Sequence, residues 1–509
     1  MTSNIVEFYR GKNLFITGGT GFLGIALIEK LLRSCPDVGQ IYLLMRSKKG
    51  KTIEQRLEEL CKNTIFETLL EKSSPDIFKK LIPVTGDVGD EDLGLSPADR
   101  QRLVDNVNVV FHSAATLDFQ ASLKPTVNIN LLGTRRVMEL CQQIRNMKAM
   151  VHVSSAYVNS FLLETHEQLY PAPEIAEKVI DLAQTLSDEA VDELTPGLLK
   201  DHPNTYTFTK HLAEHEVNNC AKRFPCGIVR PSMITAAWKE PVPGWTNSKN
   251  GPQGFLMGAS KGVIRRLPVG LDLVYDYIPV DVVVNQLIVV AEQISRKGPG
   301  ETAIFHCTSS TYNPFRWASV SKKVNGYLHK YPLKSAVWYP HLRFVQSLLL
   351  FKVSAIFIHF LPAYILDGIT KIAGGRPILV RLHTNVWESL KRLEKFIFTE
   401  WKFHNTRTLE LSKSLSPVDK QLFNIDIITL VWEDYFVHLT QGVRRYLNNE
   451  QPKSLPQARK KDTVLLFIHL GLQLLIHCGV WWFVASLLGL PMSKCPFIVP
   501  LSYVLMGFL

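Results

Sequence analysis

The feature that most constrains this sequence is a glycine-rich turn, Gly18-Gly19-Thr20-Gly21-Phe22-Leu23-Gly24, placed between a short apolar run and an amphipathic stretch. Strand, glycine turn and helix in this order form the dinucleotide-binding unit of α/β proteins. Gly18 and Gly21 let the backbone turn tightly and approach a pyrophosphate, whose charge the N–H groups of the helix N-terminus favour. Gly24 lets the helix pack on the sheet. We therefore predict cofactor contacts from Gly18, Thr20, Gly21, Phe22, Leu23 and Gly24.

The apolar pattern of the first part of the chain predicts a parallel β-sheet. Short apolar runs at 14–16, 41–44, 107–111 and 150–153 are separated by amphipathic stretches. Strands that alternate with helices in this way form βαβ units. The predicted fold class is therefore α/β, with a Rossmann-type doubly wound parallel sheet. An acidic stretch from Glu164 to Glu193, with two prolines at its front, indicates a helical insertion.

Farther along the chain, the strand pattern gives way to long helical stretches and then to an uncharged apolar segment. Thr463 to Ser493 contains no Asp, Glu, Lys or Arg, and its apolar part exceeds the roughly 20 residues that a membrane helix needs. A buried core helix is the alternative. The final stretch, Cys495 to Leu509, is also uncharged but short for a full crossing. We expect a catalytic Rossmann domain with substrate-binding insertions at 1–340, a helical domain at 341–450, a linker at 451–462 and one or two membrane segments at 463–509.

Charge and cysteine spacing exclude several classes of partner and site. The net charge of +11 comes without a basic run interleaved with aromatics, so we expect no nucleic-acid partner. The eight cysteines show no C-x-x-C pair, which predicts reduced thiols, no disulfides and no metal site. Basic residues precede the apolar segment at 453–461, whereas only Lys494 follows it. Because segments rich in Lys and Arg stay cytoplasmic, the catalytic body is expected to face the cytosol.

The turn after the second predicted strand indicates which dinucleotide binds. Arg46 stands there, 22 residues after Gly24, where an NAD site usually places an acid for the ribose hydroxyls. A guanidinium suits a 2′-phosphate instead, so we predict NADPH as the cofactor, with a solvated basic turn as the alternative. Asp87 and Val88 follow the third predicted strand, where the adenine would lie, and complete the predicted cofactor contacts.

A tyrosine and a lysine four residues apart are the predicted centre of the chemistry. Tyr206 and Lys210 fall on one face of a predicted helix, because residues i and i+4 are neighbours there. A neighbouring cation favours the ionised form of tyrosine, whose ordinary pKa is near 10, and so makes it a better proton exchanger. Ser154 and Ser155 end the strand at 150–153, where a hydroxyl can orient a substrate carbonyl. Alone, such a tyrosine–lysine pair is most often part of a surface helix.

Together these motifs resemble the extended short-chain dehydrogenase/reductase superfamily and, more closely, its alcohol-forming fatty acyl-CoA reductases. The resemblance covers about residues 10 to 450 and implies catalytic roles for Tyr206 as proton donor, Lys210 as ribose ligand and modulator of the tyrosine pKa, and Ser155 as the residue that orients the carbonyl. The family commonly has Ser-Thr where this chain has Ser154-Ser155, so Ser154 is the rival for the serine role. The segments that carry the resemblance are 151–159, 206–210, 229–232, 240–245, 251–254, 261–262, 278–281, 401–405, 423–426 and 442–447.

The resemblance also implies a long- or very-long-chain fatty acyl-CoA as substrate and two hydride transfers. The lipid membrane is expected as a partner from the apolar segment rather than from the resemblance. NADPH would reduce the thioester to a hemithioacetal, which loses CoA to give an aldehyde, and a second NADPH would reduce the aldehyde to a primary fatty alcohol. Two alternatives stay open, a membrane-bound steroid or sterol dehydrogenase of the same superfamily and a non-catalytic NADP-binding scaffold at a lipid surface. The endoplasmic reticulum is the first expected location and the peroxisomal membrane the second, because the chain ends in Gly-Phe-Leu rather than Ser-Lys-Leu.

Overall fold

A computed structural model describes residues 3–48, 50–489, 491, 493, 500 and 502, and the chain forms two compact units. The chain passes between these units several times. The domain boundaries predicted from the sequence follow the order of the chain instead, and they stay predictions. Unit 1 comprises Met1–Thr246, Val274–Phe315 and Glu400–Tyr435, and unit 2 comprises Asn247–Leu273, Arg316–Thr399 and Phe436–Leu509.

Unit 1 is built on a seven-stranded sheet with the strand order β12-β7-β5-β4-β1-β2-β3, in which each of the six neighbouring pairs is parallel. The order reverses beside β1, as it does in doubly wound folds that bind dinucleotides. The predicted Rossmann-type sheet is therefore confirmed. The strands are β1 (Leu14–Thr17), β2 (Ile41–Met45), β3 (Leu81–Thr85), β4 (Val109–His112), β5 (Ala149–Val153), β7 (Cys226–Pro231) and β12 (Ala303–Cys307).

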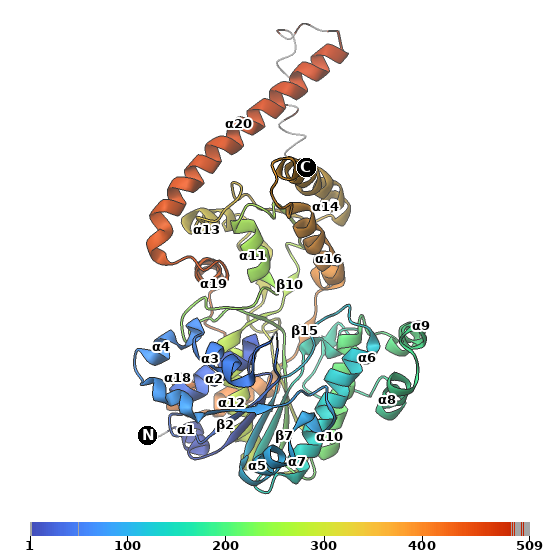
Figure 1. The fold of residues 1–509 in the computed structure, drawn as a ribbon, viewed down its shortest axis with the longest axis vertical. Helices are drawn as coiled ribbons and strands as arrows, with labels where there is room; N and C mark the ends of the chain where they lie inside the picture. Colours follow the sequence, from blue (N-terminus) through green and yellow to red (C-terminus); the bar gives the residue numbers. More distant parts are fainter. Residues whose placement is uncertain are drawn as a thin grey trace. The chain divides into compact units, whose positions relative to one another are not determined.

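Helices cover both faces of this sheet (Figure 1). On one face α2 (Phe22–Ser34) contacts α12 (Val280–Lys297), and on the other α7 (Gly133–Gln143) contacts α10 (Thr205–Cys220). The core consists of apolar side chains from the strands packed against these helices. The shorter helices of unit 1 are α1 (Asn4–Tyr9), α3 (Ile53–Cys61), η1 (Thr64–Phe66), α4 (Glu67–Leu70), η2 (Pro75–Lys80), η3 (Glu91–Gly94), α5 (Pro97–Asn106), α6 (Leu123–Thr126), η4 (Val127–Leu132), η5 (Ala156–Asn159), α17 (Thr406–Ser414) and α18 (Pro417–Leu422).

The acidic stretch between β5 and α10 forms the predicted helical insertion, with α8 (Ala176–Thr185) and α9 (Asp188–Leu199). A short strand, β6 (Glu164–Thr165), precedes these helices and pairs in parallel with β15 (Lys402–Phe403). This pairing joins the part of the chain after 400 to the Rossmann domain. Two further short strands of unit 1, β8 (Met233–Thr235) and β11 (Tyr277–Pro279), also pair in parallel.

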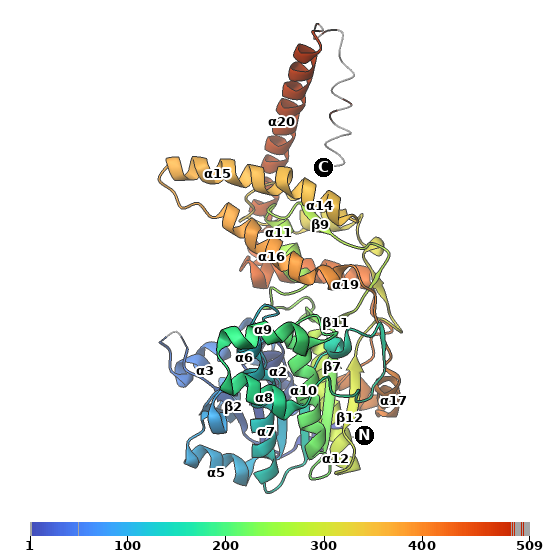
Figure 2. The ribbon, with the colours of Figure 1, turned by 90° about the vertical axis from the view of Figure 1, so that its right-hand side faces the viewer.

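Unit 2 is mostly helical, with one parallel pair formed by β9 (Arg266–Pro268) and β14 (Arg343–Val345). The helices α14 (Leu348–Ala355), η7 (Ile356–Phe360) and α15 (Leu361–Ile372) follow one another without a break, and α16 (Leu379–Ile397) runs back along α15 (Figure 2). Other helices of unit 2 are α11 (Pro252–Ser260), η6 (Trp317–Ser319), α13 (Val324–Lys330), η8 (Val443–Leu447), η9 (Pro452–Ser454) and α20 (Leu455–Leu487), while β10 (Val274–Tyr275), β13 (Phe315–Arg316) and α19 (Trp432–Gly442) lie at the unit boundaries.

The long helix α20 covers part of the predicted linker and most of the first predicted membrane segment. The polar stretch 451–462 was expected to be a linker, but α20 begins at Leu455, Ala458 is fully buried, and Asp462 Oδ2 accepts a hydrogen bond from His329 Nδ1 at 2.9 Å. Among the described residues, two helices are long and apolar enough to cross a membrane, Pro452–Leu487 and Leu348–Ile372. The second was predicted only as part of the helical domain. The predicted tail segment Cys495–Leu509 lies outside the described residues, apart from 500 and 502.

Candidate active site

The glycine turn between β1 and α2 has the shape that a pyrophosphate requires. Gly18 has a φ of +73°, and a Cβ there would lie 2.8 Å from backbone atoms of Ser113 and Ala114. A Cβ on Gly24 would lie 2.2 Å from the Gly18 carbonyl oxygen. Gly21 is the N-cap of α2 and provides no side chain to cap the helix. No side chain caps the first N–H groups of α2, and uncapped N–H groups at a helix N-terminus are donors that suit a phosphate.

Two arginines meet at the carboxyl ends of β1, β2 and β3. Arg46 Nη1 lies 2.7 Å from Asp87 Oδ2, so two residues predicted to contact the cofactor form an ion pair. Arg56, on α3, donates from Nη1 to the Arg46 carbonyl oxygen and from Nη2 to Thr20 Oγ1 at 3.4 Å. Sequence reasoning missed Arg56. The sequence did contain a signal for it. Thr52 and Gln55 form a capping box that begins α3 shortly after Arg46, and this places Arg56 near the start of the helix.

Val88, predicted to contact the cofactor, has a buried side chain. That side chain is 5% exposed and belongs to the apolar core of unit 1, where it meets Gly133. Its carbonyl oxygen accepts a hydrogen bond from Arg136 Nη1 at 2.9 Å. Any contact of Val88 with a cofactor must therefore come from its backbone, whereas the Asp87 carboxylate is partly exposed.

Tyr206 lies in the first turn of α10 beside the end of β5. Its side chain is buried, and its hydroxyl shares a hydrogen bond with Ser155. Burial raises the pKa of Tyr206 to about 12, and the hydrogen bond with Ser155 opposes this shift. The expectation that a neighbouring cation lowers the pKa of this tyrosine is therefore wrong for the protein without cofactor. The phenol is fully protonated at neutral pH, which is the form that a proton donor needs.

Lys210 lies one turn after Tyr206 on the same face of α10. Its ammonium donates a hydrogen bond of 2.7 Å to the carbonyl oxygen of Val153, the last residue of β5. Burial lowers the pKa of Lys210 to about 8, and the charge of Glu214 opposes this shift. The lysine is thus held at the carboxyl end of the sheet.

Ser154 and Ser155 take different positions, although they are adjacent. Ser154 Oγ donates to Glu214 Oε1 at 2.6 Å, whereas Ser155 Oγ accepts from the Tyr157 N–H at 3.2 Å and reaches the Tyr206 hydroxyl. Glu214 is in turn paired with Arg230. Burial raises the pKa of Glu214, but the charge and hydrogen bonds of Arg230 and the hydrogen bond from Ser154 hold it below its usual value. Ser155 is therefore the serine that faces the tyrosine.

Several motif residues shape the loops around the sheet. Asp281 Oδ2 accepts hydrogen bonds from the N–H groups of Lys239, at 2.8 Å, and Glu240, at 3.0 Å. These contacts fix the loop that leads to Trp245, whose buried ring stacks on Phe22 at the start of α2 with 5.5 Å between ring centroids. The motif at 278–281 thus holds the motif at 240–245 beside the glycine turn.

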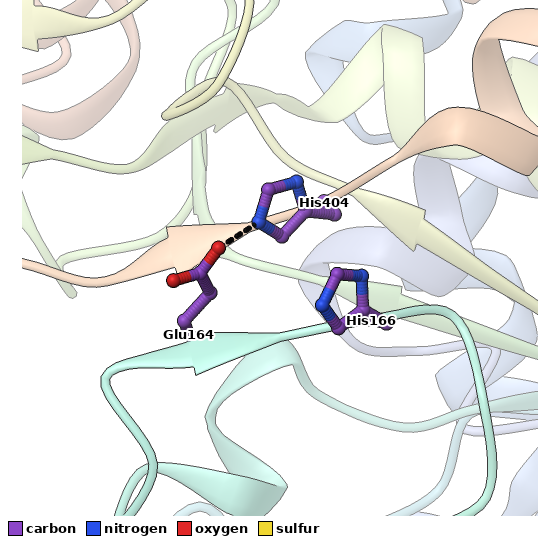
Figure 3. Close-up of side chains that lie close together, drawn as sticks. All are labelled: Glu164, His166 and His404. Carbon is purple, nitrogen blue, oxygen red and sulfur yellow. Dashed lines mark hydrogen bonds and ion pairs between the residues drawn. The ribbon is translucent and has the colours of Figure 1, made fainter.

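A polar cluster of Glu164, His166 and His404 joins β6 to the segment that follows β15 (Figure 3). His404 Nε2 lies 2.5 Å from Glu164 Oε1, and the two imidazole rings stack with centroids 4.4 Å apart and planes 8° apart. Because lone pairs lie in the plane of each ring, stacked rings direct them within two nearly parallel planes that do not meet at one ion. This geometry suits a hydrogen-bonded clamp, and the expectation of no metal site stays a prediction.

Two family models, both described as "Male sterility protein", match the chain, one for NAD binding over residues 16–287 and one over residues 358–450. The chain is 34% identical to fatty acyl-CoA reductase 1 of Homo sapiens over 505 residues, which covers 99% of this chain and 98% of that protein. The chain belongs to the fatty acyl-CoA reductase family. A Drosophila melanogaster protein, whose name assigns it provisionally to the same family, is 60% identical over 514 residues and covered completely, as is this chain.

The match of the NAD-binding model includes the glycine turn, Arg46, Ser155, Tyr206 and Lys210 of the reductase. The reductase therefore binds a nicotinamide dinucleotide. Membership in this family sets aside the steroid or sterol dehydrogenase alternative. It also accounts for the motifs after residue 400, which a dehydrogenase of that kind left unexplained.

Solved structures show the same fold. The terminal reductase domain of the myxalamid biosynthetic pathway superposes with a TM-score of 0.56 at 18% identity, over 87% of the reductase and 92% of that chain. The reductase domain of a non-ribosomal peptide synthetase from Mycobacterium tuberculosis gives a TM-score of 0.55 at 15% identity, over 88% and 96%. These similarities concern the fold alone, and they agree with the predicted fold class.

Proposed function

We propose that the reductase converts long- or very-long-chain fatty acyl-CoA to primary fatty alcohol in two successive reductions, with NADPH as the hydride donor. The observation that carries this proposal is the group formed by Ser155, Tyr206 and Lys210 at the carboxyl end of the sheet that also bears the glycine turn. The intact group argues against the alternative of a silent scaffold. Relatives that are named fatty acyl-CoA reductases match the whole chain, and this supports the choice of substrate.

Each residue of the group has a role that follows from its surroundings. The reduced nicotinamide, when bound, supplies a hydride to the carbonyl carbon in each reduction. Tyr206, protonated at neutral pH because burial raises its pKa to about 12, donates a proton to the carbonyl oxygen as negative charge develops there. Ser155 shares a hydrogen bond with that phenol and orients the carbonyl. Lys210, fixed by Val153, holds the ribose hydroxyls.

The same residues serve both reductions. In the first, protonation of the thioester oxygen by Tyr206 yields a hemithioacetal, whose carbon–sulfur bond breaks to release the CoA thiol and an aldehyde. In the second, Tyr206, reprotonated from solvent, gives its proton to the aldehyde oxygen and an alcohol forms. Each reduction needs one proton donor beside the carbonyl oxygen, and Tyr206 can serve in both, so one site is sufficient.

We propose NADPH rather than NADH because two guanidinium groups, those of Arg46 and Arg56, lie where an NAD site has an acid. The ion pair between Arg46 and Asp87 orients Arg46 across the end of β3. Arg56 reaches the Arg46 carbonyl oxygen and Thr20, so it can contribute a second positive charge to a 2′-phosphate.

We further propose that the reductase is membrane-associated with its catalytic body facing the cytosol, at the endoplasmic reticulum first and the peroxisomal membrane second. Two apolar helices support membrane association, and the basic residues at 453–461 support the orientation. Protease added to sealed microsomes should digest the body of the protein. Protection of residues 1 to 450 would show the opposite orientation.

The activity is tested by incubating purified full-length protein in detergent with an acyl-CoA series and either NADPH or NADH. Products are identified by mass spectrometry, and released CoA is measured with a thiol reagent. Fatty alcohol should form with two equivalents of NADPH consumed for each CoA released. Aldehyde as the only product would contradict the second reduction, and no CoA release with any acyl chain would contradict the proposed function.

A further inference from the structure

Unit 2 carries a continuous row of exposed apolar side chains on α14, η7 and α15, which we call the apolar face. The row is long, and its last member, Ile372, is 90% exposed. Soluble proteins rarely expose so many large apolar side chains together, and such patches mark surfaces for proteins or membranes. The apolar face consists of Leu349, Leu350, Val353, Ile356, Phe357, Leu361, Tyr364, Ile365, Leu366, Ile369 and Ile372.

The opposite side of these helices is fixed to the rest of unit 2. Phe351 is buried and stacks on Trp387 of α16, with ring centroids 5.9 Å apart. His359 Nε2 accepts hydrogen bonds from the N–H groups of Arg265, at 3.1 Å, and Arg266, at 3.2 Å. If this helix crossed a bilayer, these hydrogen bonds would break and their polar groups would lie in hydrocarbon without partners. The geometry therefore suits a helix that lies along a membrane surface with one side inserted.

The turn after α15 is held in the same way. Asp367 accepts hydrogen bonds from the N–H groups of Leu379, at 3.0 Å, and Val380, at 2.8 Å, and so caps the start of α16. This contact joins α15 to α16 and keeps the apolar side chains of α15 on the outer side.

Positive charge surrounds the apolar face. Residues 348–381 contain Lys352, Lys371, Arg376 and Arg381 against the single carboxylate Asp367. Behind α14, Arg266 of β9 and Arg343 of β14 are register partners. Arg343 is exposed and Arg266 is buried, and burial, followed by the neighbouring charges of Arg343 and Arg265, lowers the pKa of Arg266 to about 10. Such a rim favours anionic headgroups over a second copy of the same cationic surface.

The segment that leads into the apolar face contacts the middle of α20, at His469. Trp338 Nε1 donates to His469 Nδ1 at 3.3 Å, and the ring of His341 lies 6.5 Å from that of His469. His341 Nε2 in turn accepts from Arg343 Nε at 3.2 Å, so the arginines behind α14 also flank α20. From His469 to Leu487 the helix extends about 27 Å, close to the roughly 30 Å thickness of the hydrocarbon core. A bilayer crossed by α20 would therefore have its surface at the level of these arginines.

We propose that the apolar face is a second membrane-binding surface, which inserts part-way into a bilayer that contains anionic phospholipids while α20 anchors the chain. This surface is independent of the reaction that the protein catalyses. It would hold unit 2 against the lipid surface instead of leaving it tethered by one helix.

The test uses the full-length protein reconstituted into vesicles that contain a lipid with a photoactivatable carbene precursor in its acyl chain. After illumination, the labelled peptides are identified by mass spectrometry. Peptides from 348–372 should be labelled together with those from 470–487, and labelling of 348–372 should increase when phosphatidylserine is added to phosphatidylcholine. Labelling confined to 470–487 would overturn the proposal, as would equal labelling of 348–372 in neutral and anionic vesicles.

A double variant, Ile365→Asp with Ile369→Asp, provides the second arm. Charged groups are disfavoured in hydrocarbon, so labelling of 348–372 should fall by about tenfold or more while labelling of 470–487 is unchanged. Ile175→Asp, at an exposed apolar position of unit 1, is the matched control and should alter neither. Circular dichroism and NADPH binding check the fold. Unchanged labelling of 348–372 in the double variant would overturn the proposal.

Discussion

Arg230 and Glu214 form an ion pair whose side chains are both fully buried, with Nη2 2.6 Å from Oε2 and Nε 2.8 Å from Oε1. Arg230 lies on β7 and Glu214 on α10, and Ser154 at the end of β5 donates to the same carboxylate. The pair thus connects two strands to the helix that carries Tyr206 and Lys210. It stabilises the arrangement of the site without taking part in the chemistry.

The substitution Glu214→Gln should strongly destabilise the protein. It leaves the Arg230 guanidinium buried without its counter-charge, which typically costs about 3–5 kcal/mol. The free energy of unfolding of unit 1 is measured in detergent by urea titration, with tryptophan fluorescence and NADPH binding as probes. Glu58→Gln, which breaks a fully exposed pair with Lys62, is the control and should leave the free energy of unfolding nearly unchanged, because solvent screens exposed pairs. A loss for Glu214→Gln as small as that of the control would contradict the assignment.

Tyr206→Phe removes the proton that the tyrosine donates but keeps the ring. Turnover with acyl-CoA should fall by about 10²- to 10⁴-fold, the usual contribution of general acid catalysis. The Kd for NADPH, measured by fluorescence, should stay within about threefold, because the phenol donates to substrate rather than to the dinucleotide. Tyr42→Phe, at a tyrosine that bonds Gln40 far from the site, should retain full turnover. Alcohol production by Tyr206→Phe at the unmodified rate would refute the role of proton donor.

Replacing each of the two serines after β5 by alanine should have different effects, one on turnover and the other on stability. Ser155→Ala removes the hydrogen bond to Tyr206 and should lower kcat by about tenfold or more, with little change in stability. Ser154→Ala removes a hydrogen bond to the buried Glu214 carboxylate and should cost about 1.5–3 kcal/mol of stability, with kcat nearly unchanged. If Ser154→Ala lost turnover and Ser155→Ala did not, the two roles would have to be exchanged.

Preference for NADPH should depend on both Arg46 and Arg56. Arg46→Asp and Arg56→Asp should each reduce the ratio of kcat/KM for NADPH over NADH by an amount equivalent to about 1.5–3 kcal/mol, the value of a charge-assisted phosphate contact. Arg102→Asp, an exposed change on α5, is the control. An unmodified protein that used both cofactors equally would sink this prediction, and an unaffected ratio in Arg56→Asp would leave the preference to Arg46 alone.

The pH dependence of kcat/KM for NADPH should follow the loss of the charge on Lys210. Burial lowers the pKa of Lys210 from its usual 10.5 to about 8, so its charge is present below about pH 8 and lost above it. The value of kcat/KM for NADPH, which reflects the free enzyme, should therefore fall as pH rises through about 8. Lys210→Arg, which stays charged, should flatten this fall at a lower overall rate. An identical high-pH limb in Lys210→Arg would assign it to another group.

The contribution of Lys210 to the free energy of unfolding should increase as pH rises above about 8, whereas kcat/KM for NADPH decreases. Between about pH 8 and 10.5 the unfolded state binds more protons at this lysine than the folded state does. The contribution of Lys210 to the free energy of unfolding therefore rises with pH across that window. Tyr206 adds nothing to the activity profile there, because burial raises its pKa to about 12.

Local patterns predicted much of unit 1. The glycine turn, the strand runs and the acidic insertion depend on near neighbours in the chain, so β1, α2 and the α8–α9 pair appear where they were expected. The spacing of Tyr206 and Lys210 likewise predicted one helix face. Long-range burial could not be read in this way, and it explains the error over the pKa of Tyr206. The lysine four residues away was visible in the sequence, whereas the desolvation that raises the pKa of the tyrosine was not.

Other features depend on contacts between distant segments. Arg56 joins the cofactor end of the sheet only because the capped helix α3 turns back toward Thr20. The polar stretch 451–462 has the composition of a linker, yet contacts with His329 and Lys334 keep it helical. The apolar segment 348–372 has no residue pattern that distinguishes a core helix from an exposed one. Its exposure became apparent only from the structure.

Because α20 is one continuous helix, the number of residues that can be inserted into it is restricted. Its 33 residues form one helix, which packs against the rest of unit 2 through the buried side chains of Ala458, Leu465 and His469. One residue inserted after His469 would rotate everything beyond it by about 100° and advance it by about 1.5 Å. A flexible tether would absorb such a change without effect. Here the part of α20 after His469 has a fixed rotation relative to the part that packs on unit 2, so insertions should be tolerated best in steps of about seven residues, which nearly restore that rotation.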